Sequence, residues 1–113
     1  MADSDRKRGD CAQVAAEIVL DQPGDELLLA HGYPIGRGEL NGGERYFHAW
    51  VETADGTTVI DKSNGLDVTM PRSVYYTVGR IVDDEVIRYD THDVRFHIVN
   101  TGHWGPWEDE EIW

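Results

Sequence analysis

Three side chains of this protein together have the chemistry of a nucleophilic cysteine site. Cys11 is the only cysteine, His48 lies in the segment HAWVE, and Asp61 ends the segment TTVID. A nucleophilic cysteine needs surroundings that favour its thiolate, a base that handles its proton, and a group that orients this base. Cys11, His48 and Asp61 supply one candidate for each role, so the sequence predicts a catalytic triad.

Cys11 is predicted to lie in the first turn of a helix over residues 10–21. The apolar residues of this segment recur at helical spacing, Asp10 is a candidate N-cap, and Pro23 and Gly24 stop the helix. The free N–H groups and the dipole of a helix N-terminus stabilise a thiolate, and they can also hold the oxyanion of an acyl intermediate.

His48 and Asp61 are predicted to lie on two paired strands. Segments 45–52 and 57–61 are rich in strand-forming residues, and Asp55-Gly56 between them is a strong turn signal. In an antiparallel hairpin of this kind, Asp61 becomes a cross-strand neighbour of His48. Asp61 is then placed to fix the tautomer and orientation of the imidazole, as the third member of a triad does.

A short apolar strand over residues 27–30 is predicted before a glycine-rich loop over residues 32–43. Long loops in small domains often form the walls of a binding site. We therefore expect His31 and Tyr33 beside this loop, and Trp50 on the hairpin, to contact substrate. The loop lacks the lysine and the following helix of a phosphate-binding loop.

The second half of the chain is predicted to add two helices and a strand. Pro71 is expected at the first position of a helix that ends near Gly79, and a strand follows at residues 86–89. Thr91 is expected as the N-cap of the last helix. Several apolar side chains are expected to face the core: Tyr75, Tyr76, Val94, Ile98, Val99, and Trp104 and Trp107 of the folded-back tail.

The fold class that follows is α+β, with an N-terminal helix that carries the cysteine, a small antiparallel sheet and further helices. Residues 10–107 are expected to form a single domain. Residues 1–9 are expected to be a mobile charged terminus, and residues 108–113 an acidic tail.

The sequence around the three candidate residues resembles that of transglutaminase-like and papain-like cysteine enzymes. In these enzymes a cysteine begins a helix, a histidine lies in a strand similar to HAWVE, and an acidic partner follows in a segment similar to VIDKS. The resemblance implies a minimal core of that fold, catalysis by Cys11, His48 and Asp61, and acyl transfer from a peptide or protein amide. The usual aromatic surroundings of the nucleophile are absent, since Cys11 lies in GDCAQ.

The whole chain also resembles small bacterial and phage proteins with a layout of HAWVE, VIDKSNG and GHWGPW. That second resemblance implies no activity. A rival interpretation is therefore a binding protein, non-enzymatic or catalytically inactive, which uses the glycine-rich loop and the Trp-rich tail as its contact surface. In that case Cys11 is a small buried side chain, His48 a structural histidine, and Asp61 a turn residue.

Composition excludes several other classes of function. The formal net charge is −12, and only two of the ten basic residues are lysines. An acidic excess of this size keeps a protein soluble in concentrated salt, so we interpret it as salt adaptation, with an ordinary acidic protein as the alternative. In either case the negative charge disfavours nucleic-acid binding. No apolar run is long enough to cross a bilayer, and we do not expect the first residues to act as a secretion signal. The single cysteine fits a reducing compartment. We expect a cytoplasmic protein without a membrane partner.

A metal site is the remaining alternative for the titratable residues. Cys11, His31 and His48 are of the right types, but their spacing does not match a Cys-x-x-Cys or His-x-x-x-His pair. We therefore expect neither a metal nor another cofactor. The sequence leaves the oligomeric state open.

Overall fold

The computed structural model describes residues 11–22, 26–35, 45–62, 67–105 and 107. The expected N-cap Asp10, most of the glycine-rich loop, and the predicted mobile terminus and acidic tail lie outside these described residues. The predictions for these segments therefore stay predictions.

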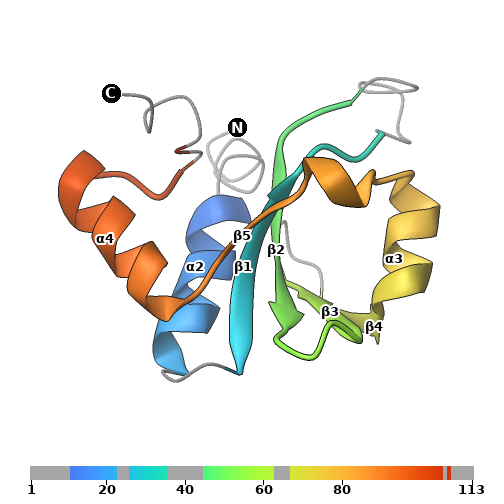
Figure 1. The fold of residues 1–113 in the computed structure, drawn as a ribbon, viewed down its shortest axis with the longest axis horizontal. Helices are drawn as coiled ribbons and strands as arrows, with labels where there is room; N and C mark the ends of the chain where they lie inside the picture. Colours follow the sequence, from blue (N-terminus) through green and yellow to red (C-terminus); the bar gives the residue numbers. More distant parts are fainter. Residues whose placement is uncertain (1–10, 23–25, 36–44, 63–66, 106, 108–113) are drawn as a thin grey trace.

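Five strands form one antiparallel sheet in the order β4-β3-β2-β1-β5 (Figure 1). The strands are β1 (Leu27–Gly32), β2 (His48–Thr53), β3 (Thr58–Asp61), β4 (Val68–Pro71) and β5 (Ile87–Tyr89). β2 and β3 are the two strands of the expected hairpin. Its turn contains Gly56 at a φ of +79°, a conformation that glycine adopts without strain.

Helices cover both faces of this sheet (Figure 1). α2 (Cys11–Asp21) and α4 (Thr91–Thr101) pack on one face, and α3 (Arg72–Gly79) lies against the other. A 3-10 turn, η2 (Asp83–Glu85), precedes β5. The α+β fold class is therefore confirmed, with an N-terminal helix that begins at Cys11, an antiparallel sheet and further helices.

Side chains of β2 alternate between two hydrophobic cores, because successive strand residues point to opposite faces. Ala49 and Val51 join the larger core beneath α2 and α4, whereas Trp50 forms a smaller core on the α3 side. His48 and Glu52 share the α3 side with Trp50. The smaller core is completed by Ala30, Val59 and Val86, with Tyr75, Tyr76 and Ile81 packed against it.

The Trp-rich segment after α4 folds back on the larger core. Trp107 is fully buried there, Trp104 packs against the same cluster, and the Trp107 indole N–H donates to the carbonyl oxygen of His103 over 3.0 Å. Trp107 is thus a core residue and offers no contact surface to a partner.

The start of α3 differs from the sequence prediction. Pro71 is not the first helical residue but ends β4 and stands before the helix with an extended ψ of 139°. β4 itself was not predicted. Its side chains alternate, with Val68 and Met70 half-buried and Thr69 and Pro71 exposed, so it is a short edge strand that pairs with β3.

The last helix differs at its start and on its outer face. Asp90, not Thr91, is the N-cap: its carboxylate accepts from the N–H of Asp93 over 2.8 Å, and the Asp93 carboxylate accepts from the N–H of Asp90. Val94 is fully buried, but Val99 is 82% exposed. Val99 follows the core-packed Ile98 by one residue, which is about 100° around an α-helix, so the two cannot face the same core.

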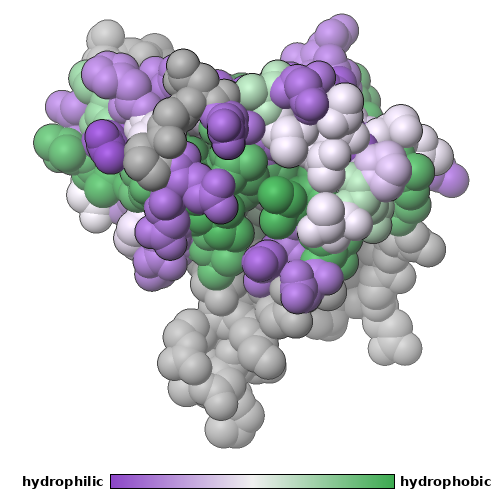
Figure 2. All heavy atoms as spheres, turned by 90° about the horizontal axis from the view of Figure 1, so that it is seen from below, coloured by the Kyte–Doolittle hydropathy of each residue, from purple (hydrophilic) through white to green (hydrophobic). Residues whose placement is uncertain are grey.

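Apolar side chains also reach the surface. On the face shown in Figure 2, hydrophobic side chains lie between groups of hydrophilic ones. None of the described helices combines the length and the apolar character needed to cross a membrane.

Candidate active site

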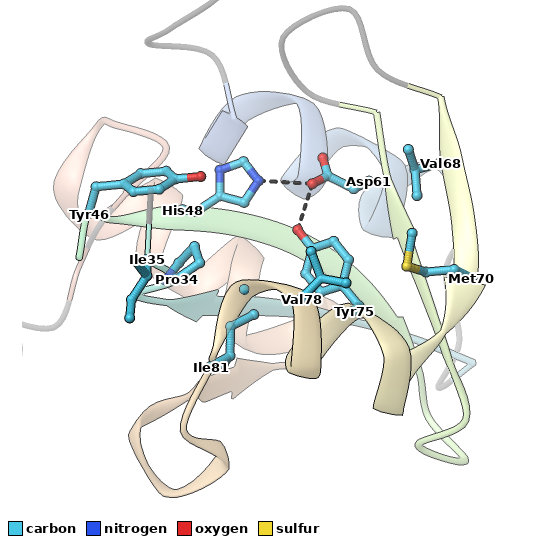
Figure 3. Close-up of a pocket in the computed structure, with 11 residues that line it drawn as sticks. Pro34, Ile35, Tyr46, His48, Asp61, Val68, Met70, Tyr75, Val78 and Ile81 are labelled. Atoms are coloured by element: carbon cyan, nitrogen blue, oxygen red, sulfur yellow. Dashed lines mark hydrogen bonds and ion pairs between the residues drawn. The ribbon is translucent and has the colours of Figure 1, made fainter. Parts of the chain in front are cut away.

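His48 and Asp61 are in direct contact on the α3 side of the sheet. The β2–β3 register pairs Val51 with Ile60, and its continuation places Asp61 one diagonal step from His48 on the same face. His48 Nε2 lies 2.9 Å from Asp61 Oδ2, and both side chains are buried (Figure 3). The hairpin therefore brings the predicted base and the predicted orienting carboxylate together.

Asp61 has a second donor that the sequence did not reveal. The hydroxyl of Tyr75, on α3, donates over 2.6 Å to Asp61 Oδ2, the same oxygen that contacts His48. Burial raises the pKa of Tyr75, and the negative charge of Asp61 and this hydrogen bond raise it further, so the hydroxyl keeps its proton. The Tyr75 ring also packs 5.3 Å from the Trp50 ring, as expected of a core residue.

Cys11 is 7% exposed at the beginning of α2, next to the end of the sheet where β2 starts (Figure 1). Its thiol interacts with the His48 ring and raises the pKa of that ring. Because Nε2 of that ring contacts Asp61, Nδ1 is the nitrogen left to face the thiol. The three residues of the predicted triad are therefore neighbours in the structure.

The charge of His48 follows from its surroundings. Burial lowers the pKa of His48, but the hydrogen bonds with Asp61 and Cys11, together with the negative charges of these two partners, raise it more strongly, to about 9. The imidazole is therefore protonated at neutral pH. An imidazolium next to a thiol favours the thiolate, which is the nucleophilic form of cysteine.

Trp50, which was expected to contact substrate, does not line the cavity next to His48. It is fully buried in the smaller core, and its indole N–H donates to Glu52 Oε2 over 2.9 Å. Its ring is stacked with that of His48, with centroids 6.0 Å apart. Trp50 thus packs beside the His48 ring on the same face of the sheet.

The other two residues expected to contact substrate also lie elsewhere. His31 pairs with Ala49 in the β1–β2 register, so its side chain points to the face opposite that of His48 and is 1% exposed. Tyr33 is 39% exposed and does not line the cavity next to His48. Around His31 are three aromatic rings, those of Phe47, Tyr89 and Trp107.

A cavity of about 270 Å³ lies next to His48 and Asp61 (Figure 3). At the edge of the cavity, the hydroxyl of Tyr46 points toward the His48 ring, and Tyr75 forms part of the cavity wall. The remaining wall is apolar and comes from the segment after β1, from β4 and from the end of α3. Its main contributors are Pro34, Ile35, Val68, Met70, Val78 and Ile81.

The sequence held one signal for this wall, the alternation of Val68 and Met70 in β4. The convergence of β4, α3 and the segment after β1 was not visible, because it depends on how α3 docks on the sheet. A backbone hydrogen bond from the Ile35 N–H to the Gly79 carbonyl oxygen, 2.8 Å long, fixes two of these segments to each other.

A second polar cluster lies further along the same face. Glu52 is 1% exposed and accepts hydrogen bonds from Trp50, from the Tyr76 hydroxyl and from Arg88 Nε at 2.8 Å. Arg88 also contacts Asp83 Oδ1 at 2.8 Å. Every oxygen of the buried Glu52 carboxylate therefore has a donor, so this cluster is explained as a structural support of β2.

Among the described residues, no three His, Cys, Asp or Glu side chains are grouped so that they could hold a metal ion. Comparisons of the chain with models of protein families, with curated proteins and with solved structures found no match. The relationship to transglutaminase-like and papain-like enzymes therefore stays a prediction that rests on the sequence motifs.

Proposed function

We propose that this protein is a cysteine-dependent acyl-transfer enzyme that acts on a peptide or protein amide. The observation that carries the proposal is the buried His48 ring, which has the Asp61 carboxylate at Nε2 and the Cys11 thiol as its other side-chain partner. This is the arrangement that a nucleophile, a base and an orienting group require. The resemblance of HAWVE and VIDKS to transglutaminase-like and papain-like enzymes supports the same assignment.

In the proposed reaction, the Cys11 thiolate attacks the carbonyl carbon of the amide. The new S–C bond forms, the carbonyl electron pair moves to oxygen, and N–H groups at the start of α2 hold the oxyanion. When the tetrahedral intermediate collapses, the C–N bond breaks and His48 gives its proton to the leaving amine. Asp61 keeps the imidazole in the orientation that this transfer needs.

The resulting thioester is then attacked by water or by an amine. His48 takes the proton of the incoming group, and the S–C bond breaks to return Cys11. Water as acceptor makes the protein an amide hydrolase or a deamidase, whereas an amine makes it a transferase.

The pH dependence of Cys11 alkylation tests this proposal. Because Cys11 is the only cysteine, iodoacetamide labelling followed by intact mass reports this one thiol. Burial slows the reaction by the same factor at every pH, so the ratio of the rates at pH 6 and pH 9 is the diagnostic quantity. We expect the ratio in the native protein to exceed that of the urea-unfolded chain at least about tenfold, and to drop to the unfolded value in His48→Ala.

Cys11→Ala is the control for labelling at other groups. Native and unfolded chains with the same pH profile, or a profile that His48→Ala leaves intact, would contradict the proposal. That result would favour a binding protein in which Cys11 and His48 are structural.

A further inference from the structure

We infer that the cavity beside His48 binds an uncharged, apolar group attached to the reacting carbonyl of the substrate. The inference rests on the proposed function, because it assigns a role to the cavity within that reaction. It names the substrate class: an acyl group about as large as a six-carbon chain.

The cavity adjoins the base of the proposed reaction. Its wall runs past the His48 ring, from Tyr46 on one side of the ring to Asp61 on the other (Figure 3). When the amine has left, the acyl group is the part of the substrate that stays on Cys11. This is the part that we assign to the cavity.

The lining of the cavity sets the polarity of this group. Apart from the mutually bonded His48 and Asp61, the described residues of the wall carry no charged side chain. The two tyrosines of the wall, Tyr46 and Tyr75, direct their hydroxyls at His48 and Asp61. A charged group has no partner there, and burial of an unpaired charge is strongly unfavourable.

The volume of the cavity sets the size of the group. A volume of 270 Å³ equals that of roughly nine liquid water molecules at about 30 Å³ each. A six-carbon chain fits within such a space, whereas an acetyl group leaves most of it empty. An acyl group that fills the cavity displaces water from an apolar wall, and this favours the longer chain.

The rim of the cavity offers a matched pair of positions for mutation. Val78 and Val74 lie one turn apart on α3, with exposures of 50% and 47%. Val78 lines the cavity and Val74 does not. A tryptophan at Val78 therefore fills the cavity, and a tryptophan at Val74 makes the same change on the same helix outside it.

Transfer of acyl groups from p-nitrophenyl esters to Cys11 tests the inference. The thiolate forms an S–C bond with the ester carbonyl, the C–O bond breaks, and p-nitrophenolate leaves with the electron pair. We would compare acetyl, hexanoyl and 6-hydroxyhexanoyl esters, each rate divided by that with free N-acetylcysteine. The hydroxylated chain has the same six carbons as hexanoyl. It carries no charge, so repulsion by the acidic protein does not affect the comparison.

We expect hexanoyl transfer at least about tenfold faster than acetyl or 6-hydroxyhexanoyl transfer in the native protein. Val78→Trp should reduce this preference at least fivefold, whereas Val74→Trp should preserve it. Met70→Trp, which fills the cavity from β4, gives a second reading if Val78→Trp folds poorly.

The outcomes separate the two proposals. Equal hexanoyl and acetyl rates on a Cys11 that still depends on His48 would overturn the acyl-group inference and leave the proposed function standing. A preference that survives both Val78→Trp and Met70→Trp would do the same. Absence of acylation with every ester, or acylation unchanged in His48→Ala, would overturn the proposed function itself.

Discussion

His48 Nε2 and Asp61 Oδ2 are 2.9 Å apart, and the two residues reach each other across a hairpin from adjacent strands. Neither side chain is more than 7% exposed. The contact therefore joins a buried imidazole to a buried carboxylate, and such a pair is stable only when the two charges compensate each other. This relationship accounts for a polar histidine within an otherwise apolar strand.

Removal of the Asp61 charge is expected to neutralise His48. In Asp61→Asn the ring loses its main compensating partner while burial still opposes the imidazolium, so the pKa of His48 should drop from about 9 to below neutrality. Long-range ¹H–¹⁵N NMR spectra at pH 7.5 distinguish the two ring states, and Cys11 alkylation at pH 6 should slow in parallel. Asp67→Asn removes a charge from an exposed position and is the control. A His48 that stays cationic in Asp61→Asn would contradict this account.

The raised pKa of His48 also predicts how stability changes with pH. The pKa is about 9 in the folded protein and 6.5 in the unfolded chain, so this contribution is complete below pH 6.5 and is lost as the pH rises through 9. In Cys11→Ala, which removes the thiol that would otherwise titrate in the same range, the free energy of unfolding should decrease by up to about 2 kcal/mol between pH 7 and 9.5.

Urea unfolding of Cys11→Ala at a series of pH values, with His48→Gln added to it in parallel, measures this loss. The decrease should be smaller in His48→Gln. Tyr75, whose pKa is raised, adds its own loss only above pH 10, which lies outside the range. Parallel curves for the two proteins would show that His48 titrates alike in the folded and unfolded states.

The pairing of His48 with Asp61 was predictable because it depends on local sequence. Asp55-Gly56 sets the turn, the strand period of two sets the face, and the short connection leaves few registers. The fold class follows from the same kind of local pattern. The sequence likewise predicted Cys11 in the first turn of a helix, and Cys11 is the first described residue of α2.

At the candidate site, the contacts that the sequence did not reveal join segments that no short turn connects. The β1–β2 register decides that Ala30 faces Trp50 and that His31 points the other way, and a long loop separates these strands in the sequence. Tyr75 was predicted as a core residue, but its hydroxyl reaches Asp61 only because α3 docks against β3 and β4. The cavity wall depends on the same docking, so the sequence could not reveal it.

Loss of the Tyr75 hydroxyl should affect the site more than loss of the Tyr76 hydroxyl. Tyr75→Phe removes one of the donors that hold Asp61, so we expect a destabilisation of about 1 kcal/mol and Cys11 alkylation at pH 6 slowed several-fold. Tyr76→Phe is the matched control, since Tyr76 is the next residue of α3 and its hydroxyl contacts Glu52 and Arg88 instead. It should destabilise the protein without slowing alkylation. Equal effects of both variants on alkylation would show that Tyr75 has no specific role in orienting Asp61.

The buried Glu52 carboxylate should depend strongly on Arg88. Arg88→Met leaves Glu52, which is 1% exposed, without its cationic partner, and removal of one member of a buried pair typically costs about 3 kcal/mol. Glu52→Gln combined with Arg88→Met removes both charges and should recover part of this loss. Urea unfolding of the wild type, both single variants and the double variant gives the coupling energy of the pair.

Arg72→Met is the matched control for this cycle. Arg72 contacts the more exposed Asp83 at 2.8 Å and lies over the Tyr76 ring, so its loss should cost less than about 1 kcal/mol. If Arg88→Met were no more harmful than Arg72→Met, the contact between Arg88 and the buried Glu52 would contribute no more to stability than an exposed ion pair does, and this account of the cluster would be wrong.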